Sequence, residues 1–597
     1  MHSPQPNLQS SVASAKFSVR FWFVVILIGI CAGFFGGLLM KLLHAVQHVA
    51  WSYSSGSFLE AVERSSQSWR VFVLFCAGLL VGVVRWVLRR LSAEDDGELS
   101  ETVWFRSGKF STTSTIVRSL LSIVIVGMGA SLGREGALKQ TGAAIAARLA
   151  AWAGLPASQM RLLAAYGAGA GMAAAYNVPC GGALFALEVL LGGLSLRLVV
   201  PALATSCIAT AVSWMLLPNR PSYAVPAYAL SATQIAWALI AGPLFGLASV
   251  LWIRSVAMAR RHQPSCWVQI LMPAAVFTAL GFLAVFFPQL LGNGKDVVQA
   301  AFTENIDLAL LLILPVLKLV ATATCLGSGA PGGLFTPTMT IGALLGGLLG
   351  YACHAASPEA PLGSYAILGA GAVLAASTQG PVSAIVLTLE LTWHIDPLMA
   401  PLLIVVVGAT LVAHYFESRS IYSSRLHEIE PVAASISGTR FDDLLLPEYN
   451  VVSAAASFPE VARRLLGFDS WRLPLYVVDE LGQLIGEIKA IDVSEPTKVS
   501  VPRETAIASD FAAPVPTISA CNDRDEVMRQ LRDSGSPQLP VIETTSGRIV
   551  GAVAESLLAV KSSRRLVHRT TTETPLDPAH SPQSGHDAAD NPFTERA

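Results

Sequence analysis

The sequence contains few charged residues for its length. Asp, Glu, Lys and Arg make up 14% of the 597 residues, whereas 53% are hydrophobic and the mean hydropathy is +0.54. Soluble domains carry about a quarter charged residues, so this chain cannot be a soluble protein throughout. The formal net charge is −1, and we therefore predict no polybasic surface and no nucleic-acid partner.

The sequence also lacks the motifs of a metal site or an enzyme. Its eight cysteines are scattered singly, without a C-x-x-C pair, and lie mostly inside apolar runs. We expect them to be packing residues and not disulfides or metal ligands. No Ser-His-Asp arrangement and no glycine-rich phosphate loop with its lysine can be identified. We predict that the chain is not an enzyme and requires no metal or cofactor.

What the sequence does contain is a series of long apolar segments. A membrane helix needs about 20 apolar residues. The apolar segment 21–43 is too long for a signal peptide and lacks the small-residue cleavage pattern, so we expect it to be a retained membrane helix. Several later segments are too short or too interrupted to cross the membrane as one continuous helix. Transporters contain such broken helices where they line a cavity. The segments lie near residues 21–43, 70–91, 118–131, 162–192, 198–217, 233–253, 268–291, 308–326, 338–355, 364–392 and 398–415.

The composition changes beyond about residue 417. Charged residues become frequent and short alternating strands appear, so we predict a soluble domain at residues 440–562. The stretch 563–597 is rich in Thr, Pro, Ser, Asp and His without periodicity, and we expect a disordered tail. Residues 1–20 form a second, N-terminal tail in this interpretation.

The membrane region contains an internal repeat. GAGAGMAAAYNVPCGGALFALE at residues 167–188 matches GAGAVLAASTQGPVSAIVLTLE at residues 369–390 without a gap, with nine of 22 positions identical, including Glu188 with Glu390. Such repeats in transporters place the binding site at their interface, near the middle of the bilayer. We predict two equivalent halves at residues 21–217 and 233–425.

Two glycine-rich loops occupy matching places in these halves. The spacing from Arg118 to Glu135, which lies in SLGREGA, equals the spacing from Lys318 to Phe335, which lies in GSGAPGGLFTP. Each loop precedes an apolar helix that we expect to begin at Ala137 or Pro337. The free N–H groups of a helix N-terminus attract an anion without the full charge of a lysine, which suits an ion that must leave again.

Glu135 is the acidic residue inside one of these loops. A charged residue at the centre of a membrane helix costs about 2.5–3.5 kcal/mol, so its presence needs a reason. The N–H groups that bind an anion can also bind this carboxylate, which would then block the pathway until it is protonated or displaced. The alternative is that Glu135 and Arg134 form a structural ion pair.

At these motifs the sequence resembles the CLC family of chloride channels and chloride/proton exchangers, and within it the bacterial ClcB-type channels. The resemblance covers about residues 20–425 and rests on GREGA (133–137), AAAYNVPCGGALFALEVL (173–190), GSGAPGGLFTP (327–337) and SIYSSRL (420–426). It implies an all-α polytopic domain of two inverted repeats of broken, tilted helices, and a homodimer with one pore per subunit in the inner membrane.

The resemblance assigns roles to residues in these motifs. Glu135 becomes the gate, Leu334 and Phe335 offer backbone N–H groups to chloride, and Tyr422 offers its hydroxyl at the inner end, since a phenol can hold an anion without a counter-charge. The predicted chloride-binding residues are Gly133, Arg134, Gly136, Leu334, Phe335 and Tyr422.

The sequence departs from the family at two places. The family's serine loop should fall upstream of Arg118, but residues 94–101 read EDDGELSE, and no serine ligand is recognised there. Exchangers of the family also carry an inner glutamate where this chain has Val189, after Glu188. Because valine cannot relay a proton, the sequence favours a passive, Glu-gated chloride channel, with a chloride/proton exchanger as the alternative. We interpret Glu188, duplicated as Glu390, as a structural hydrogen-bonding group.

The soluble region resembles the paired CBS domains that many CLC proteins carry at this end, on the cytoplasmic side. Residues 472–493 and 538–558 each predict strand, turn, strand and helix, and further helices are expected at 458–466 and 524–534. CBS pairs often bind adenine nucleotides through an Asp after the last strand. Asp492 occupies this place in the first copy, whereas the second copy has Leu557, so at most one half fits a nucleotide. The alternative is a docking module without a ligand.

Two further classes remain as alternatives. A CBS-regulated cation transporter would line its pathway with several carboxylates, whereas these loops present glycines and helix N-termini. Proton-coupled anion exchange would require another group, or water, in place of the inner glutamate.

Overall fold

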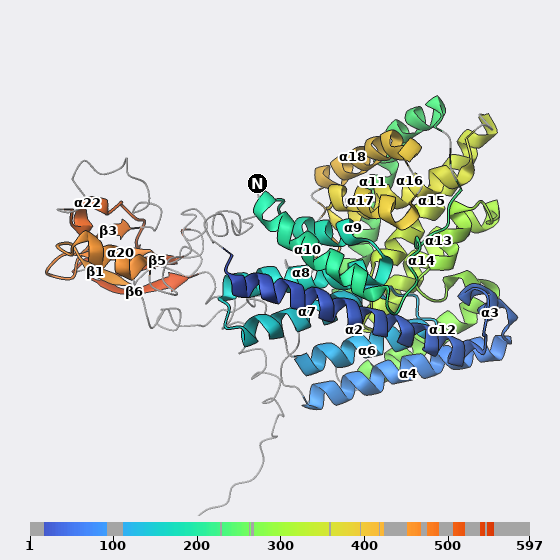
Figure 1. Cartoon of the computed structure of the whole chain (residues 1–597), viewed down its shortest axis with the longest axis horizontal. Coiled ribbons are helices and arrows are strands. Elements are labelled where there is room, and N and C mark those ends of the chain that lie inside the picture. Colours follow the sequence, from blue (N-terminus) through green and yellow to red (C-terminus); the bar gives the residue numbers. More distant parts are fainter. Residues whose placement is uncertain are drawn as a thin grey trace, which may run out of the picture. The chain divides into compact units, whose positions relative to one another are not determined.

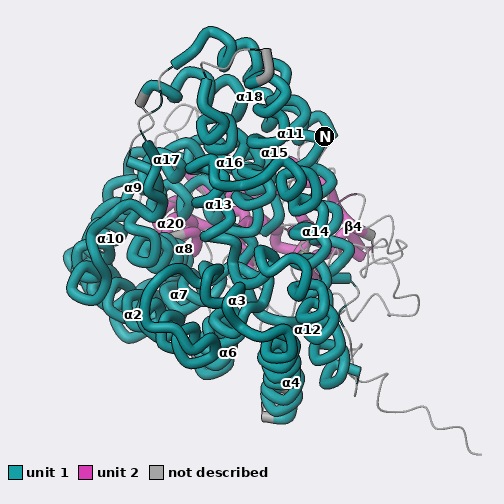
Figure 2. The backbone as a smooth tube through the Cα atoms, turned by 90° about the vertical axis from the view of Figure 1, so that its right-hand side faces the viewer, with its two compact units in different colours: residues 1–426 teal, residues 427–597 magenta. Residues whose placement is uncertain are grey.

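The computed structural model describes the membrane region almost completely and parts of the C-terminal region. The described residues are 17–91, 112–416 (except 227, 229, 262, 264–267, 357–359 and 394–395), 418, 420–422, 450–466, 474–488, 506–519, 530, 538–543 and 546–554. The chain forms two compact units, residues 1–426 and 427–597 (Figure 2). Residues 94–101, Asp492, the predicted tail 563–597 and most of the expected helix 524–534 lie outside the described residues.

The regular elements in the described part of the first unit are helices, and α2 lies beside α7 and α8 (Figure 1). Its longer helices are α2 (Val19–Trp51), α4 (Gln67–Leu91), α6 (Thr112–Gly127), α7 (Glu135–Trp152), α8 (Ala157–Tyr176), α10 (Leu196–Ser213), α11 (Ala232–Arg261), α12 (Val268–Phe286), α14 (Leu308–Gly327), α15 (Phe335–Ala356), α16 (Leu362–Thr378), α17 (Pro381–Thr392) and α18 (Met399–Tyr415). The short helices are α3 (Phe58–Arg64), α9 (Pro179–Phe185), the π-helix η1 (Ala186–Leu190), the 3-10 helices η2 (Pro288–Leu290) and η3 (Asp396–Leu398), and α13 (Lys295–Phe302).

Six helices of the described part are long and apolar enough to span a membrane: Val19–Trp51, Gln67–Leu88, Leu196–Ser213, Ala232–Arg261, Val268–Phe286 and Leu308–Gly327. Large apolar side chains project from them, for example Leu239 and Ile240 of α11, which are 62% and 71% exposed. Lipid tolerates such surfaces, whereas water does not favour them. Shorter apolar helices such as α9 and α17 accompany these spans.

The first membrane helix begins slightly earlier than predicted. Ser18 caps α2, and its hydroxyl accepts a hydrogen bond from the Phe21 N–H at 3.2 Å. The helix therefore includes Val19 and Arg20, which the sequence analysis places in the N-terminal tail. A serine at this position satisfies one of the N–H groups that a helix start leaves free.

The sequence repeat corresponds to a repeated backbone. α8 and α16 both end on a residue in the left-handed conformation, Asn177 (φ 60°) and Gln379 (φ 57°). The next residues, Val178 (φ −131°, ψ 69°) and Gly380 (φ −133°, ψ 72°), lead into α9 and α17, which both begin with proline. The matching dihedral angles occur at the same offset as the sequence repeat, which indicates that the two halves have the same local fold.

The two halves also bond to one another through a symmetric exchange. Glu188, in η1, accepts hydrogen bonds from the N–H groups of Val382 (3.1 Å) and Ser383 (2.6 Å) at the start of α17. Glu390, in α17, accepts from Cys180 (2.9 Å) and Gly181 (2.7 Å) at the start of α9. A carboxylate at a helix N-terminus satisfies free N–H groups and favours the helix dipole. Each half thus caps a helix of the other.

Small residues allow the helices to approach closely in both halves. A Cβ on Gly142 of α7 would lie 2.0 Å from the carbonyl oxygen of Gly167 in α8, and one on Gly342 of α15 would lie 2.5 Å from that of Gly369 in α16. Close backbone approach at small residues is the usual way in which membrane helices associate. These contacts fix α7 and α15, which carry the site described below.

The second unit contains two small sheets of the same design. β1 (Val451–Ser453) pairs parallel to β2 (Leu475–Val478), which pairs antiparallel to β3 (Leu484–Ile488). β4 (Ile518–Ser519), β5 (Gln538–Ile542) and β6 (Ile549–Ala554) repeat this order. The turns of the two hairpins meet, since Gln483 and Arg548 form an antiparallel bridge. The expected strand, turn and strand of each copy are present.

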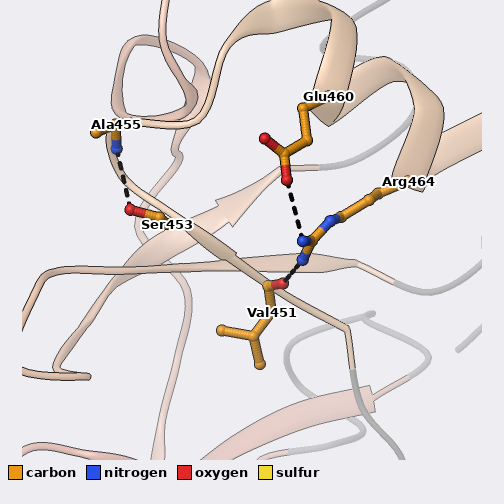
Figure 3. A network of polar contacts seen from close by, with 5 residues as sticks. All are labelled: Val451, Ser453, Ala455, Glu460 and Arg464. Atoms are coloured by element: carbon orange, nitrogen blue, oxygen red, sulfur yellow. Dashed lines mark hydrogen bonds and ion pairs between the residues drawn. The ribbon is translucent and has the colours of Figure 1, made fainter.

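A helix packs on the first of these sheets. α20 (Phe458–Leu466) has the bounds expected from the sequence, and α22 (Ala508–Phe511) lies in the same core. Arg464 of α20 binds Glu460 at 3.0 Å and donates to the carbonyl of Val451 in β1 (Figure 3). These contacts join the helix to the edge of the sheet.

The prediction that the cysteines are packing residues holds for only some of them. The six described cysteines are free thiols, and of these Cys325 is buried, whereas Cys180 and Cys207 are exposed. Both exposed thiols lie on apolar helices, where a sulfhydryl can face lipid as a small apolar group. The apolar context of the sequence therefore did not distinguish a buried cysteine from an exposed one.

Candidate anion site

The two glycine-rich loops meet in the structure. Gly133 and Gly333 exchange backbone hydrogen bonds in both directions, each with an N···O distance of 2.7 Å. α7 begins at Glu135 and α15 begins at Phe335, two residues earlier than predicted in each case. Two helix N-termini therefore converge on one place, and their free N–H groups make it favourable for negative charge.

The Glu135 carboxylate occupies this place. It is fully buried, and its Oε1 accepts a hydrogen bond from the Phe335 N–H at 2.5 Å. Its Oε2 accepts from the hydroxyls of Tyr176 at 3.2 Å and Thr336 at 3.4 Å, and these two hydroxyls lie 2.8 Å apart. A buried carboxylate with three donors is held in one position, and the same donors would be available to another anion if the side chain left.

Arg134 lies between this site and a cavity. Its side chain is only 5% exposed, and its guanidinium lies 4.6 Å from the centre of the Tyr176 ring. No ion pair of the described residues joins Arg134 to Glu135. The structural ion pair that we considered for these neighbours is therefore not formed, and the arginine stacks on an aromatic face instead.

The cavity has a volume of about 380 Å³ and is lined by more basic than acidic residues. Arg134, Arg220 and Lys295 face it, together with Asp296. The Asp296 carboxylate accepts a hydrogen bond from the Leu59 N–H at 2.9 Å, which draws it toward the backbone of α3. A cleft lined mainly by positive charge raises the local concentration of anions, so this cavity is suited to be an entrance to the Glu135 site.

Tyr422 lies beside Lys139 of α7 and not beside Glu135. Its ring packs edge-on against Phe185 with a centroid distance of 5.6 Å, and the Lys139 ammonium lies 4.0 Å from the Tyr422 ring centre. The preceding residue, Ile421, is tied to the end of α16 by a hydrogen bond from its N–H to the Ser377 carbonyl at 2.9 Å. Tyr422 is therefore fixed in the membrane unit although it follows the last membrane helix.

The structure brings together most of the residues predicted from the sequence. Leu334 and Phe335 are both 1% exposed at the start of α15, and Gly136 packs on the backbone of the opposite loop, where a Cβ would lie 2.9 Å from Gly333 N. Tyr422 is not in this cluster and is connected to it through Lys139, one turn along α7 from Glu135. Asp492 lies outside the described residues.

Sequence reasoning missed several residues of this site. Tyr176 lies in the quoted AAAYNVP motif but received no role, and Thr336 directly follows Phe335. Lys139 could have been found from its spacing, because residues four apart lie on one face of a helix. Arg220 and Lys295 carry no sequence signal for this site, since only the tertiary fold places them at the cavity.

The family model and the relatives that match this chain belong to the same family. Residues 83–414 match the family model described as voltage gated chloride channel. A protein of Ralstonia nicotianae, provisionally named a ClcB-like chloride channel protein, is 32% identical over 396 residues, which cover 63% of this chain and 90% of the relative. The H⁺/Cl⁻ exchange transporter ClcA of Cronobacter sakazakii is 32% identical over 386 residues, covering 60% and 79% of the two chains.

Solved structures share the fold. A slow cyanobacterial Cl⁻/H⁺ antiporter is 21% identical and matches with a TM-score of 0.62, over 69% of this chain and 98% of that chain. A eukaryotic CLC transporter is 20% identical, with a TM-score of 0.61 over 90% and 97%. The predicted fold class, a helical membrane domain followed by a small α/β domain, is confirmed. This chain is a multi-pass membrane protein and belongs to the CLC family of voltage-gated chloride channels and related transporters.

Proposed function

We propose that this protein exchanges chloride for protons across the membrane. Glu135 is the group that binds the proton and whose carboxylate alternates with chloride at the same site. The observation that carries the proposal is the position of the Glu135 carboxylate, which takes hydrogen bonds from Phe335 N–H and the Tyr176 hydroxyl. The names of several relatives as H⁺/Cl⁻ exchange transporters support exchange over the passive channel that the sequence alone favoured.

The chemistry of the site suggests how the two ions would alternate. Phe335 N–H and the hydroxyl groups stabilise a negative charge, so they favour either an ionised Glu135 or chloride in its place. Protonation removes the charge of the carboxyl group and weakens these hydrogen bonds. The neutral side chain can then leave and chloride can enter. The carboxyl group later releases its proton, and the ionised carboxylate returns to the site and displaces chloride.

A passive channel remains the second candidate, and Val189 is the observation that favours it. The side chain at this position packs near Gly380, where an added Cβ would lie 2.6 Å from Val189 Cγ2. A valine can neither accept nor donate a proton. Exchange would require protons to reach Glu135 from the other side by another group or by water.

A flux assay in liposomes tests both candidates. We expect chloride efflux from the native protein to be accompanied by proton movement in the opposite direction, and the reversal potential to shift with the pH gradient. Glu135→Ala should keep chloride flux but lose both proton movement and pH dependence. Unchanged chloride flux with unchanged pH dependence in this variant would remove Glu135 as the gate, and native chloride flux without proton movement would establish the channel instead.

For the C-terminal unit we propose a CBS pair on the cytoplasmic side of a protein that forms a homodimer in the inner membrane. The support is the repeated strand order of its two sheets. Adenine nucleotide is a candidate ligand. Calorimetric titration of the full-length protein with ATP, in native and Asp492→Ala forms, tests this: binding lost in the variant supports a nucleotide site, and no binding in either form leaves a docking module.

A further inference from the structure

A segment shortly after α10 is held against the end of α8. It comprises residues 218–224 and is called the strap below. α8 ends at Tyr176, whose hydroxyl donates to Glu135, and Asn177 takes the left-handed conformation that ends the helix. The Ser222 hydroxyl of the strap donates a hydrogen bond to the Tyr176 carbonyl at 2.9 Å. The strap is therefore bonded to the residue that helps to hold the gate.

The Asn177 side chain uses both ends of its amide to bind this segment. Its Nδ2 donates to Asn219 Oδ1 at 2.9 Å and to the Arg220 carbonyl at 3.3 Å. Its Oδ1 accepts from the indole N–H of Trp214, next to the end of α10, at 2.9 Å. Because an amide has distinct donor and acceptor ends, these partners hold it in one orientation. Asn177 thus fixes the backbone of Arg220 directly.

The far end of the strap is bound to α13. The Gln299 amide of α13 accepts from the Ala224 N–H at 2.9 Å and donates to the Ala224 carbonyl at 2.6 Å. Lys295 lies four residues earlier, on the same face of this helix. Lys295 and Arg220 both line the cavity described above. The strap therefore connects α8 to α13, and it presents one of the basic residues of the entrance from between these two attachments.

The internal repeat provides a comparison for Asn177. Its counterpart in the second half is Gln379, which has nearly the same backbone conformation, with φ 57° against 60°. The Gln379 amide donates to the carbonyl of Ala376 at 2.7 Å, in its own helix α16. The left-handed helix end is thus common to both halves, whereas the side chain reaches across to a strap in the first half. Ending the helix does not require those contacts, so they point to a separate role of Asn177.

We propose that Asn177 and Gln299 are positioning residues that hold Arg220 at the entrance, where its charge draws chloride toward Glu135. This inference rests on the proposed function in one respect, since it assumes that chloride reaches Glu135 through this cavity. A guanidinium on an untethered loop would spread its charge over many positions. With the backbone fixed on both sides, the cost of ordering the loop is met when the protein folds. The charge then stays over the cavity and raises the local concentration of chloride.

Chloride flux in liposomes tests the role of Asn177. Asn177→Gly removes the side chain and keeps the left-handed conformation, which glycine adopts readily. We expect the half-saturating chloride concentration on the cavity side to rise about two- to fivefold, more at low ionic strength than at high. The maximal flux should stay within about twofold of native, because only the approach of the anion changes. Gln299→Ala should act in the same way. Gln379→Gly makes the matched change in the second half and should leave half-saturation unchanged.

A double variant separates positioning from a general loss of structure. Arg220→Gln should itself raise the half-saturating concentration, and adding Asn177→Gly should then have no further effect, since no charge is left to position. An equal effect of Asn177→Gly with and without Arg220 would overturn the proposal. If Asn177→Gly does not fold, Gln299→Ala is carried through the same cycle.

The native protein serves as the control that separates this inference from the proposed function. Native chloride flux together with unchanged half-saturation in Asn177→Gly and Gln299→Ala would overturn the positioning role alone. Absence of chloride flux in the native protein would reject the proposed function, and this inference with it.

Discussion

Gly133 leaves free the space that the Glu135 carboxyl group fills. A Cβ on Gly133 would lie 2.1 Å from Glu135 Oε1, 2.3 Å from Oε2 and 2.5 Å from Cδ, and these are its three nearest neighbours. The closest contacts of a side chain at Gly133 would therefore be with Glu135, two positions along the chain. This relationship allows the position of the gate to be changed without removing the glutamate.

We predict that Gly133→Ala displaces the Glu135 carboxyl group and opens the pathway. The distances to the added Cβ are far inside van der Waals contact, so the carboxyl group must move. Chloride efflux from liposomes at neutral pH should rise toward that of Glu135→Ala, and the double variant should equal Glu135→Ala, since the alanine then has no carboxyl group to meet.

Gly136→Ala is the matched control for this prediction. An added Cβ at Gly136 would meet the backbone of Gly332 and Gly333 at 2.9 Å, and Glu135→Ala cannot relieve that contact. Gly136→Ala should therefore lower thermal stability in both backgrounds. Native efflux from Gly133→Ala would contradict the carboxylate position described here.

Tyr176→Phe should weaken the hold on the gate. The variant removes the hydroxyl that donates to Glu135 Oε2 at 3.2 Å and keeps the ring under Arg134. A hydrogen bond of this kind contributes about 1 kcal/mol, so chloride efflux at neutral pH should rise about fivefold. Tyr166→Phe removes a buried hydroxyl away from the site and should have no such effect. A decrease in efflux with Tyr176→Phe would show that the hydroxyl serves chloride more than it serves Glu135.

Replacement of Glu188 or Glu390 should cost stability and leave transport intact. Each carboxylate accepts two N–H groups of a helix start in the other half. Glu188→Ala and Glu390→Ala should each lower the free energy of unfolding by about 1–2 kcal/mol, and the two values should be similar because the positions are equivalent. Thermal unfolding in detergent measures this, with the exposed Glu63→Ala as control.

Transport by the same variants separates a structural role from proton transfer. The ratio of proton to chloride movement in Glu188→Ala should equal that of the native protein. If Glu188→Ala kept its stability and lost only proton movement, Glu188 would be a proton relay and the structural interpretation would be wrong.

Lys295→Gln should reduce chloride entry from the side of the cavity. Lys295 lines the cavity together with Arg134 and Arg220, and removal of one positive charge lowers the local concentration of chloride. The half-saturating chloride concentration on that side should rise about two- to fivefold, more at low ionic strength than at high, because salt screens such fields within about 10 Å at 0.1 M. The exposed Arg148 of α7 provides the control variant Arg148→Gln. An effect of equal size at all ionic strengths would exclude this long-range mechanism.

The sequence by itself determined the apolar spans, the internal duplication and the two glycine-rich loops. These follow from local pattern: an apolar run of sufficient length is a membrane helix, and Glu188 repeats as Glu390 at a constant offset. The same pattern identified Glu135, since a carboxylate between such loops has few structural uses. It also led from the motif to the family, which the comparisons confirm.

Only the tertiary structure decided which groups surround Glu135. Tyr176 lies 41 residues and Phe335 lies 200 residues away in the chain, and no periodicity relates them to the carboxylate. Lys139 shows the same limit: its position four residues after Glu135 was visible, but its partner rings come from Phe185 and Tyr422. Helix periodicity fixes which residues share a face, whereas the packing of helices against one another fixes what that face meets, and the chemistry of this site depends on the second.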